Sequence, residues 1–473
     1  MATNSRIPLV FPVRRCKPEF VSPAKPTLHE RKLLSGIDDQ QTLRSQVLFI
    51  QFYRYDPLMQ GKDPVEVIRK ALAKTLVFYY PFAGRLREGD NSKPTVDCTG
   101  EGVMFIEADA DVTLEQFGDA LQPPFPCINE LLYDVPGSDG ILNCPLLLLQ
   151  VTRLKCGGFI VVTRFNHVIC DGMGLKHFMS AMGEMARGAI ACSISPVWER
   201  HLLDVENTPR VTFKHHEYDE VDAATAAWPS DSNEVQRSFF FGLDEVSALR
   251  RLLPLHLRHC TKFELLTACL WRCRTIALNL GPDKKVRMLC LANLRPRSNL
   301  SLPPGYYGNA IVFPAAVTTV GELLRNPLGY AVELVRQVKA SATKKYAKSV
   351  AALMVIRAKQ LSSPNVACSY SMSDLTGMRF EDIDYGWGKA VYAAPAKVVG
   401  VVSFMIPTKS KTGDSGCSVL ICLPTLAMER FDKEIVNMLK GYPIQHLEES
   451  KKIFYFKCYV KIVLIGVRWL SFG

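Results

Sequence analysis

The sequence of 473 residues lacks the signatures of several large enzyme classes. It contains no Walker sequence and no G-x-G-x-x-G fingerprint, so chemistry on nucleoside triphosphates or dinucleotides has no support. H-E-x-x-H is also missing, and one histidine beside one aspartate supplies too few ligands for a metal. No repeat of about 20–50 residues recurs, which excludes solenoids and propellers.

The 15 cysteines form no C-x-x-C pair and no regular spacing. Cys269 and Cys273 lie in an apolar, helix-like run, where two buried thiols are the simplest interpretation. The apolar stretch at residues 7–13 is short and contains two prolines, which is atypical of a signal peptide. We therefore expect a reducing compartment and a cytoplasmic protein.

The composition is that of a large soluble protein. Hydrophobic residues make up 48% and charged residues 22% of the chain, which excludes disordered and polytopic membrane classes. The length exceeds one ordinary core, so two domains are expected. The formal net charge of +11 favours an anionic ligand such as a phosphorylated cofactor. Nucleic acid is disfavoured, because the basic residues are scattered and form no basic helix.

Helical and strand patterns alternate in both halves of the chain, which predicts a mixed α/β fold with helices beside the sheets. The first clear helix begins at Asp63 and Pro64, with Glu66 completing a capping box, and it ends before Tyr80 and Pro81. The other expected elements are strands at 146–151, 159–162, 286–291, 310–314, 397–405 and 418–423, and helices beginning near 172, 263 and 428.

We divide the chain into an N-terminal half at 1–194, a crossover at 195–234, a C-terminal half at 235–440 and an atypical tail at 441–473. Residues 450–473 contain five basic residues and no acidic one. Three of these interrupt the apolar stretch of the tail, so no membrane-spanning helix is expected, since one needs about 20 mostly uncharged residues. A disordered extension is favoured, and an interfacial contact with a membrane is the alternative.

The motif with the clearest chemistry is H-x-x-x-D-G, formed by His167, Asp171 and Gly172. It places an imidazole in the loop between an expected strand and an expected helix, where catalytic groups are often displayed. A neutral histidine can act there as a general base. A histidine packed beside a helix-capping aspartate is the alternative, and the short pattern alone favours it. Cys170 inside the motif lacks orienting residues of its own and is a poor candidate nucleophile.

Two further segments each have a chemical and a structural interpretation. Residues 413–416 (GDSG) copy the surroundings of a trypsin-type nucleophile, but their polar, lysine-rich context predicts a hairpin loop. In residues 384–388 (DYGWG), two glycines flank a tryptophan. This pattern suggests either a backbone that approaches a ligand closely or a turn pinned by a buried indole.

The order of these motifs resembles the plant BAHD acyltransferases. H-x-x-x-D-G lies near one third of the chain and a D-F-G-W-G-like box near four fifths, with Tyr385 in place of phenylalanine. Residues 80–85 (YPFAGR), 307–309 (YGN) and 423–431 match further boxes, and 34–40 (LSGIDDQ) resemble the alcohol acyltransferase branch, which includes benzyl alcohol O-benzoyltransferases. The resemblance covers about residues 8–440. It implies two chloramphenicol-acetyltransferase-like domains with a solvent channel between them.

The resemblance also implies roles for individual residues. His167 is expected to be the general base, and Asp171 to order the site by pairing with Arg295. Asp384 is expected to be mainly architectural, and Ser373 to supply a hydroxyl that holds the oxyanion. The supporting positions of the same boxes are Trp387, Gly386, Gly388 and Asn309.

These observations predict an acyl-CoA-dependent alcohol O-acyltransferase of plant ester biosynthesis. It would join an acetyl or benzoyl group to benzyl alcohol or a small aliphatic alcohol. A general base contributes on the order of 10²–10⁴ in rate and an oxyanion donor about 10²–10³, so no cofactor, metal or acyl-enzyme is needed. We expect a monomer whose partners are acyl-CoA and the alcohol. A non-catalytic ligand-binding relative and an acyl-CoA thioester hydrolase are the alternatives.

We expect deletion of residues 442–473 to leave turnover intact, because the resemblance ends before the tail. The measurement compares the initial rates of the full and truncated chains. A soluble, folded truncation without turnover would contradict this expectation.

Overall fold

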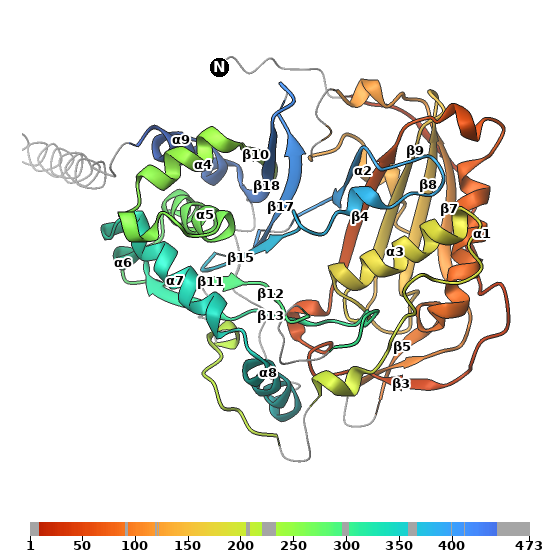
Figure 1. Cartoon of the computed structure of the whole chain (residues 1–473), viewed down its shortest axis with the longest axis horizontal. Helices are drawn as coiled ribbons and strands as arrows, with labels where there is room; N and C mark the ends of the chain where they lie inside the picture. Colours follow the sequence, from red (N-terminus) through yellow and green to blue (C-terminus); the bar gives the residue numbers. More distant parts are fainter. Residues whose placement is uncertain are drawn as a thin grey trace, which may run out of the picture.

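The computed structural model describes residues 9–441 apart from 90–92, 119–120, 122, 205–208, 220–232, 296–301, 358–366, 399 and 411. Helices and strands are mixed along the chain, as the sequence predicts. They form two lobes, each built on one large sheet with helices against it (Figure 1). The expected tail lies outside the described residues, apart from Gly441.

The first lobe holds a seven-stranded sheet of order β1-β7-β8-β9-β4-β16, with β2 paired to β7. β8 and β9 form an antiparallel pair, which confirms the strands expected at 146–151 and 159–162. β16 comes from the C-terminal half and pairs with β4, so residues far along the chain complete this sheet. The bounds are β1 Val13–Arg15, β2 Glu19–Val21, β4 Gln46–Tyr53, β7 Val103–Ala110, β8 Leu147–Leu154, β9 Phe159–Asn166 and β16 Tyr392–Pro395. A smaller sheet in the same half contains β3 Arg31–Leu33, β5 Arg85–Glu88 and β6 Pro94–Asp97.

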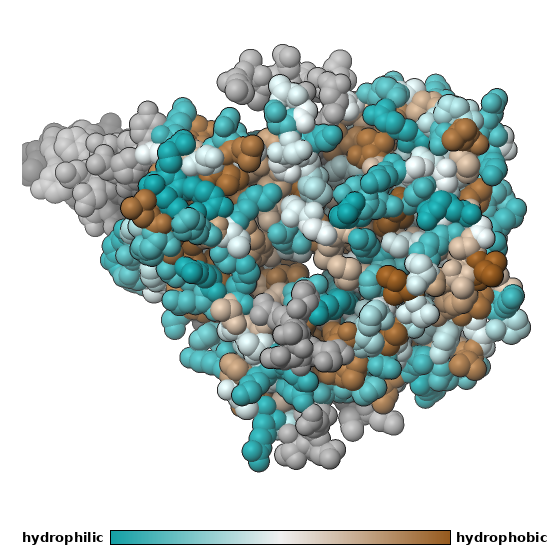
Figure 2. All heavy atoms as spheres, in the orientation of Figure 1, coloured by the Kyte–Doolittle hydropathy of each residue, from teal (hydrophilic) through white to brown (hydrophobic). Residues whose placement is uncertain are grey.

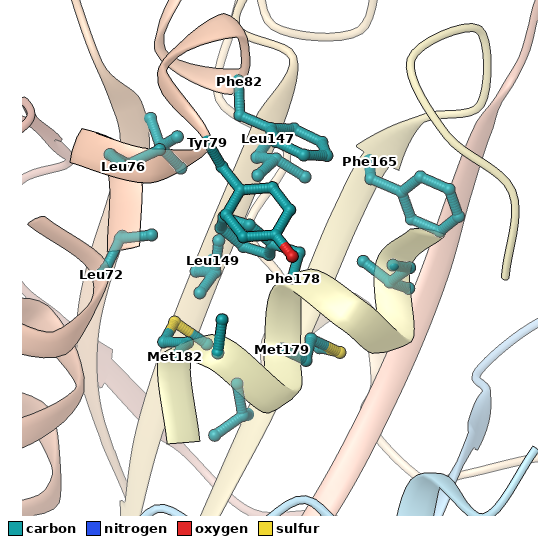
Figure 3. Packing of buried hydrophobic residues seen from close by; sticks show 14 of the residues in the cluster. Leu72, Leu76, Tyr79, Phe82, Leu147, Leu149, Phe165, Phe178, Met179 and Met182 are labelled. Atoms are coloured by element: carbon teal, nitrogen blue, oxygen red, sulfur yellow. The ribbon is translucent and has the colours of Figure 1, made fainter. Parts of the chain in front are cut away.

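Helices α1 (Pro64–Phe78) and α3 (Gly172–Ala186) bury their apolar sides against this sheet, and a short helix α2 covers Ile128–Leu131. Figure 3 shows Tyr79, Phe82 and Phe178 packed together over the leucines of β8. Asp63 caps α1 by accepting a hydrogen bond from the backbone N–H of Val65 at 3.1 Å. The expected capping box is wrong, because Glu66 pairs with Arg69 on the next turn of the helix instead.

The second lobe holds a six-stranded sheet of order β10-β18-β17-β15-β11-β14, with its helices on the outside (Figure 1). Helix α5 packs against α7 and α9, and it buries Cys269 and Cys273, as expected. The strands are β10 Glu234–Phe241, β11 Lys285–Cys290, β14 Ala315–Thr319, β15 Ser369–Asp374, β17 Val402–Lys409 and β18 Ser415–Pro424. The helices are α4 Leu243–Arg251, α5 Lys262–Leu278, α6 Val320–Arg325, α7 Leu328–Ser341, α8 Lys344–Arg357 and α9 Thr425–Lys440.

Several expected elements change in detail. The strand expected at 397–405 is wrong at its start, because β16 ends at Pro395 in one sheet and β17 begins at Val402 in the other. The strand expected at 310–314 shortens to β13 (Ile311–Val312), which pairs with β12 (Ala292–Asn293). β17 and β18 pair antiparallel, which confirms the hairpin, but Ser415 and Gly416 of the 413–416 segment already belong to β18 rather than to the loop. The domain boundaries at 194 and 235 stay predictions.

Two further expectations concern what the described residues contain. None of the fourteen cysteines among them is recorded in a disulfide. Within the same residues, no helix has the length and apolarity to cross a membrane.

Candidate active site

His167 lies in the short connection between β9 and α3. Its backbone N–H donates to the carbonyl of Ser45 at 2.9 Å. The side-chain oxygen of Asn166 accepts a hydrogen bond from the N–H of Val168 at 3.1 Å, which turns the chain out of the strand. The imidazole is half-buried. The loop therefore holds the ring at the end of a strand, as the motif predicts.

Asn309 determines which ring nitrogen of His167 carries the proton. Its side-chain nitrogen donates to the backbone carbonyls of His167 at 2.9 Å and Val168 at 3.1 Å. The amide oxygen of Asn309 therefore faces the ring, 3.2 Å from Nδ1 of His167. Since that oxygen can only accept, Nδ1 must carry the proton and donate it. Nε2 is then unprotonated and carries the lone pair that a general base requires.

The surroundings of His167 keep its imidazole neutral. Burial lowers the pKa of His167 below its ordinary value. Backbone hydrogen bonds at His167 and Cys170, the charge of Asp171 and the hydrogen bond to Asn309 offset this only in part. A lowered pKa means that the neutral, proton-accepting ring predominates at pH 7.

Asp171 is buried, and its two carboxylate oxygens accept four hydrogen bonds. Oδ1 caps α3 by accepting from the N–H groups of Met173 at 3.1 Å and Gly174 at 3.0 Å. Oδ2 accepts from Nη1 of Arg295 at 2.7 Å and from the N–H of Ala310 at 2.9 Å. Burial acts to raise the pKa of Asp171, but the Arg295 charge and these hydrogen bonds lower it overall. The expected pairing with Arg295 is therefore present, and the carboxylate is occupied by ordering the loop.

Two glycines allow the first lobe to approach the loop at 306–309. A Cβ atom on Gly174 would lie 2.0 Å from the carbonyl oxygen of Tyr307. A Cβ atom on Gly308 would lie 1.7 Å from Nη1 of Arg200. No larger residue fits at either position without moving the backbone or the guanidinium. This close contact is what brings Asn309 within reach of His167.

Ser373 is the penultimate residue of β15 and is buried. The loop after β15 leads to Met378, whose Sδ would lie 3.4 Å from a Cβ atom on Gly172. The loop that follows β15 therefore lies close in space to the N-terminus of α3, where Asp171 is found. That the Ser373 hydroxyl holds the oxyanion stays a prediction.

Asp384 lies at the other end of α3. Its Oδ1 accepts from the N–H groups of Gly386 at 2.7 Å and Gly388 at 2.9 Å. The carbonyl of Asp384 would lie 2.6 Å from a Cβ atom on Gly183, near the C-terminus of α3. A helix of 15 residues is about 22 Å long. The structure therefore places Asp384 far from the loop that Asp171 caps.

The remaining residues of the 384–388 segment form a tight, buried turn. Trp387 contacts Phe159 edge to face, with 5.1 Å between ring centroids, and Gly386 and Gly388 have φ angles of 112° and 78°. Tyr385 is fully buried and donates its hydroxyl to Gln51 at 3.2 Å. These contacts support the turn pinned by a buried indole, so Trp387, Gly386 and Gly388 are not brought together with His167.

Other candidate chemistries find no support. Cys170 is buried, and burial raises the pKa of its thiol well above the ordinary value, so a thiolate nucleophile is disfavoured. Among the described residues, no group of three or more histidine, cysteine and carboxylate side chains could hold a metal ion.

A serine–histidine–glutamate arrangement lies elsewhere, between the crossover and helix α8. Nε2 of His215 is 2.8 Å from Oγ of Ser349, and its Nδ1 is 3.0 Å from Glu217. Oγ of Ser349 also accepts from the N–H groups of Thr212 at 2.9 Å and Phe213 at 3.2 Å. Ser349 is only 1% exposed. The hydroxyl is therefore engaged and inaccessible, and the cluster ties the crossover to α8 rather than forming a hydrolase site.

The motif patterns do not single out Asp38 and Arg200, although both are charged, buried and bonded to this site. Nη1 of Arg200 donates to Asp38 at 2.8 Å, and Asp38 also bonds Asn309. The one sequence signal for Asp38 was its place in the segment at 34–40, which resembles the alcohol acyltransferase branch. Arg200 follows the first half with no motif around it.

Comparisons with known proteins agree with this geometry. A family model described as "Transferase family" matches residues 11–438. The chain is 60% identical to a benzyl alcohol O-benzoyltransferase of Petunia hybrida, covering 92% of this chain and 95% of the relative. It is 51% identical to alcohol acyl transferase 1 (allele GSd) of Malus domestica, covering 91% and 94%. It is also 53% identical to a 13-hydroxylupanine O-tigloyltransferase of Lupinus albus, covering 91% and 96%.

The fold is also similar to that of solved structures. The crystal structure of vinorine synthase matches with a TM-score of 0.68 at 22% identity, covering 90% of this chain and 98% of that one. This likeness confirms the expected chloramphenicol-acetyltransferase-like fold. The chain belongs to the BAHD transferase family. Within that family, its relatives are O-acyltransferases, and this protein is an acyltransferase enzyme.

Replacing Arg295 with glutamine is expected to destabilise the protein by about 3–5 kcal/mol, because it leaves the buried Asp171 carboxylate without its cation. Urea denaturation at pH 7 measures the loss. The matched control is Lys389→Gln, which breaks an ion pair to Asp382 of the same 2.7 Å length with a 67% exposed lysine. That change should cost at most about 1 kcal/mol. Equal losses for the two variants would contradict this account of the Asp171–Arg295 pair.

Proposed function

We propose that the protein transfers an acyl group from acyl-CoA to the hydroxyl group of a small alcohol, with His167 as the general base. The observation that carries the proposal is the contact of 3.2 Å between Nδ1 of His167 and the amide oxygen of Asn309, from which we infer an unprotonated Nε2. A thioester is already activated, so the enzyme has mainly to remove the hydroxyl proton and stabilise the oxyanion.

In the proposed reaction, Nε2 of His167 takes the proton of the alcohol as its oxygen attacks the thioester carbonyl. The negative charge moves to the carbonyl oxygen, where the Ser373 hydroxyl is our candidate donor. The intermediate then collapses to the ester, and the C–S bond breaks. The CoA thiolate takes the proton from the imidazolium, which restores neutral His167. Throughout, Asn309 accepts the Nδ1 hydrogen bond and holds the ring.

The two substrates would meet between the lobes. Figure 2 shows the surface hollowed between them, and β12 and β13 lie at this junction (Figure 1). His167 contacts Asn309, which lies just before β13. The excess positive charge of the chain suits the phosphates of CoA. We propose that acyl-CoA is a co-substrate with no further cofactor, and that the protein acts as a cytoplasmic monomer without a nucleic-acid partner.

We propose benzoyl-CoA and benzyl alcohol as the first substrate pair, and acetyl-CoA with aliphatic alcohols as the second, with volatile esters as products. The 60% identity to benzyl alcohol O-benzoyltransferases supports this order. The O-tigloyltransferase, at 53% identity, is as similar as the alcohol acyl transferases are. Overall identity therefore supports the acyltransferase class more strongly than a particular alcohol.

Thiol release from benzoyl-CoA or acetyl-CoA should require benzyl alcohol or hexanol. In His167→Ala it should fall by about 10²–10⁴, the contribution of a general base. His29→Ala is the matched control, because His29 is 73% exposed and its Nε2 lies 3.7 Å from the carboxylate of Asp97. Release without alcohol would identify a thioester hydrolase. A folded protein that binds acyl-CoA but releases no thiol with any alcohol would be a ligand-binding relative.

The pH dependence should show the lowered pKa of His167. Protonation removes the lone pair on Nε2, so kcat/KM should fall as the solution is acidified. Because burial lowers this pKa from 6.5, the midpoint of the acid limb of kcat/KM should lie below pH 6.5. Initial rates at subsaturating alcohol between about pH 5 and 8 measure the profile. An acid limb centred above pH 6.5 would contradict a buried, neutral His167.

A further inference from the structure

Asp38 is a buried carboxylate behind the site, and all its partners are donors. Its Oδ2 accepts from the N–H of Ser35 at 2.9 Å and from its hydroxyl at 2.7 Å. Its Oδ1 accepts from Nη1 of Arg200 at 2.8 Å, and from the backbone N–H and side-chain Nδ2 of Asn309, both at 3.0 Å. Five donors suit an ionised carboxylate, which can only accept.

The contact with Asp38 decides how the Asn309 amide is oriented. Nδ2 of Asn309 lies among three acceptors, which are Asp38 and the carbonyls of His167 and Val168. A flipped amide would put its oxygen against all three, including the charged one. The two carbonyls belong to the loop that must be held, whereas Asp38 comes from a separate segment and also binds the Asn309 backbone. Asp38 is therefore the independent anchor of the amide.

Arg200 ties Asp38 to the same loop. Its Nη2 donates to the carbonyl of Ile169 at 2.8 Å, inside the H-x-x-x-D segment. Its guanidinium lies 4.2 Å from the ring centroid of Trp198, which holds it by a cation–π contact. Hydrogen bonds thus form a closed circuit from Ile169 through Arg200, Asp38 and Asn309 to His167.

We propose that Asp38 is a positioning residue for the general base. Together with Arg200 it holds Asn309 so that Nδ1 of His167 keeps its proton and Nε2 stays free. The inference rests on the proposed function, in which His167 is the general base. It assigns the selection of the reactive tautomer to a carboxylate that does not touch the ring. Asp38 lies outside the H-x-x-x-D-G motif. The carboxylate of that motif, Asp171, is engaged with Arg295 and the N-terminus of α3.

The test compares Asp38→Asn with Asp39→Asn. Asp39 is the neighbouring carboxylate, and it also has an arginine partner, since Arg44 donates to it from Nε at 3.0 Å and from Nη2 at 2.6 Å. In Asp38→Asn the Asn309 amide loses its anchor, and some molecules hold the proton on Nε2. We expect kcat to fall at least about tenfold, since the general base itself contributes about 10²–10⁴, with KM for acyl-CoA within about twofold. Asp39→Asn should leave kcat unchanged.

The direct readout is the ¹⁵N spectrum of histidine-labelled protein above the pKa of His167, with His167→Ala used for assignment. In the unmodified protein the proton should lie on Nδ1, and in Asp38→Asn the signal should move toward the Nε2–H form. An unmodified protein with the proton on Nε2 would overturn the inference. So would a folded Asp38→Asn with unchanged kcat and unchanged tautomer.

Asp38→Glu is the second variant, because Asp38→Asn leaves the buried Arg200 charge unpaired and can prevent folding. It keeps the charge beside Arg200 but displaces the oxygen from Asn309. The same fall in kcat with the same shift of tautomer supports the inference, and unchanged values of both overturn it. The tautomer is measured without turnover. Failure to acylate any alcohol would therefore count against the proposed function and leave the inference separately tested.

Discussion

A buried carboxylate at the start of α3 joins the two halves of the chain where the chemistry is proposed to occur. Burying an ion costs several kcal/mol, and this cost is offset only when the geometry is good and all hydrogen bonds are made. Asp171 meets that condition with two donors from its own helix and two from the second half, Arg295 and Ala310. The pair therefore constrains where α3 and the loop at 306–309 lie relative to each other.

The orientation of the base follows from that constraint. With α3 held against the loop at 306–309, the absence of a side chain on Gly174 lets the backbone of Tyr307 approach. Asn309 then lies beside the His167 ring. The loop contributes one side chain, and that side chain sets the protonated nitrogen. In the proposed reaction, Asp171 acts through placement, whereas His167 is the residue proposed to touch the substrate.

Local patterns were enough to predict the part of the site that one segment builds. Strand β9, the His167 loop and α3 follow one another in the chain, so periodicity, a turn and an N-cap aspartate identify them. The Asp171–Arg295 pair spans 124 residues and was expected only from the resemblance. The contacts of Asp38 with Arg200 and Asn309 span 162 and 271 residues, and no local pattern encodes such partners.

The same limit applies to the fold. The strand expected at 397–405 begins after β16 has ended at Pro395 and before β17 starts at Val402, because an apolar run does not reveal where the chain leaves one sheet and enters another. Glu66 fits a capping box by spacing, but the nearby Arg69 guanidinium is the better partner once the helix has formed. In both cases a tertiary or charged neighbour decided between local options that the sequence left equal.

The most direct test of the central claim is a crystal structure of the protein with CoA and benzyl alcohol bound together. The account predicts that the alcohol oxygen lies about 2.6–3.2 Å from Nε2 of His167, a hydrogen-bond distance for proton transfer, while Asn309 still contacts Nδ1. An alcohol bound against Asp171, or a His167 ring turned so that Nδ1 faces the alcohol, would contradict it.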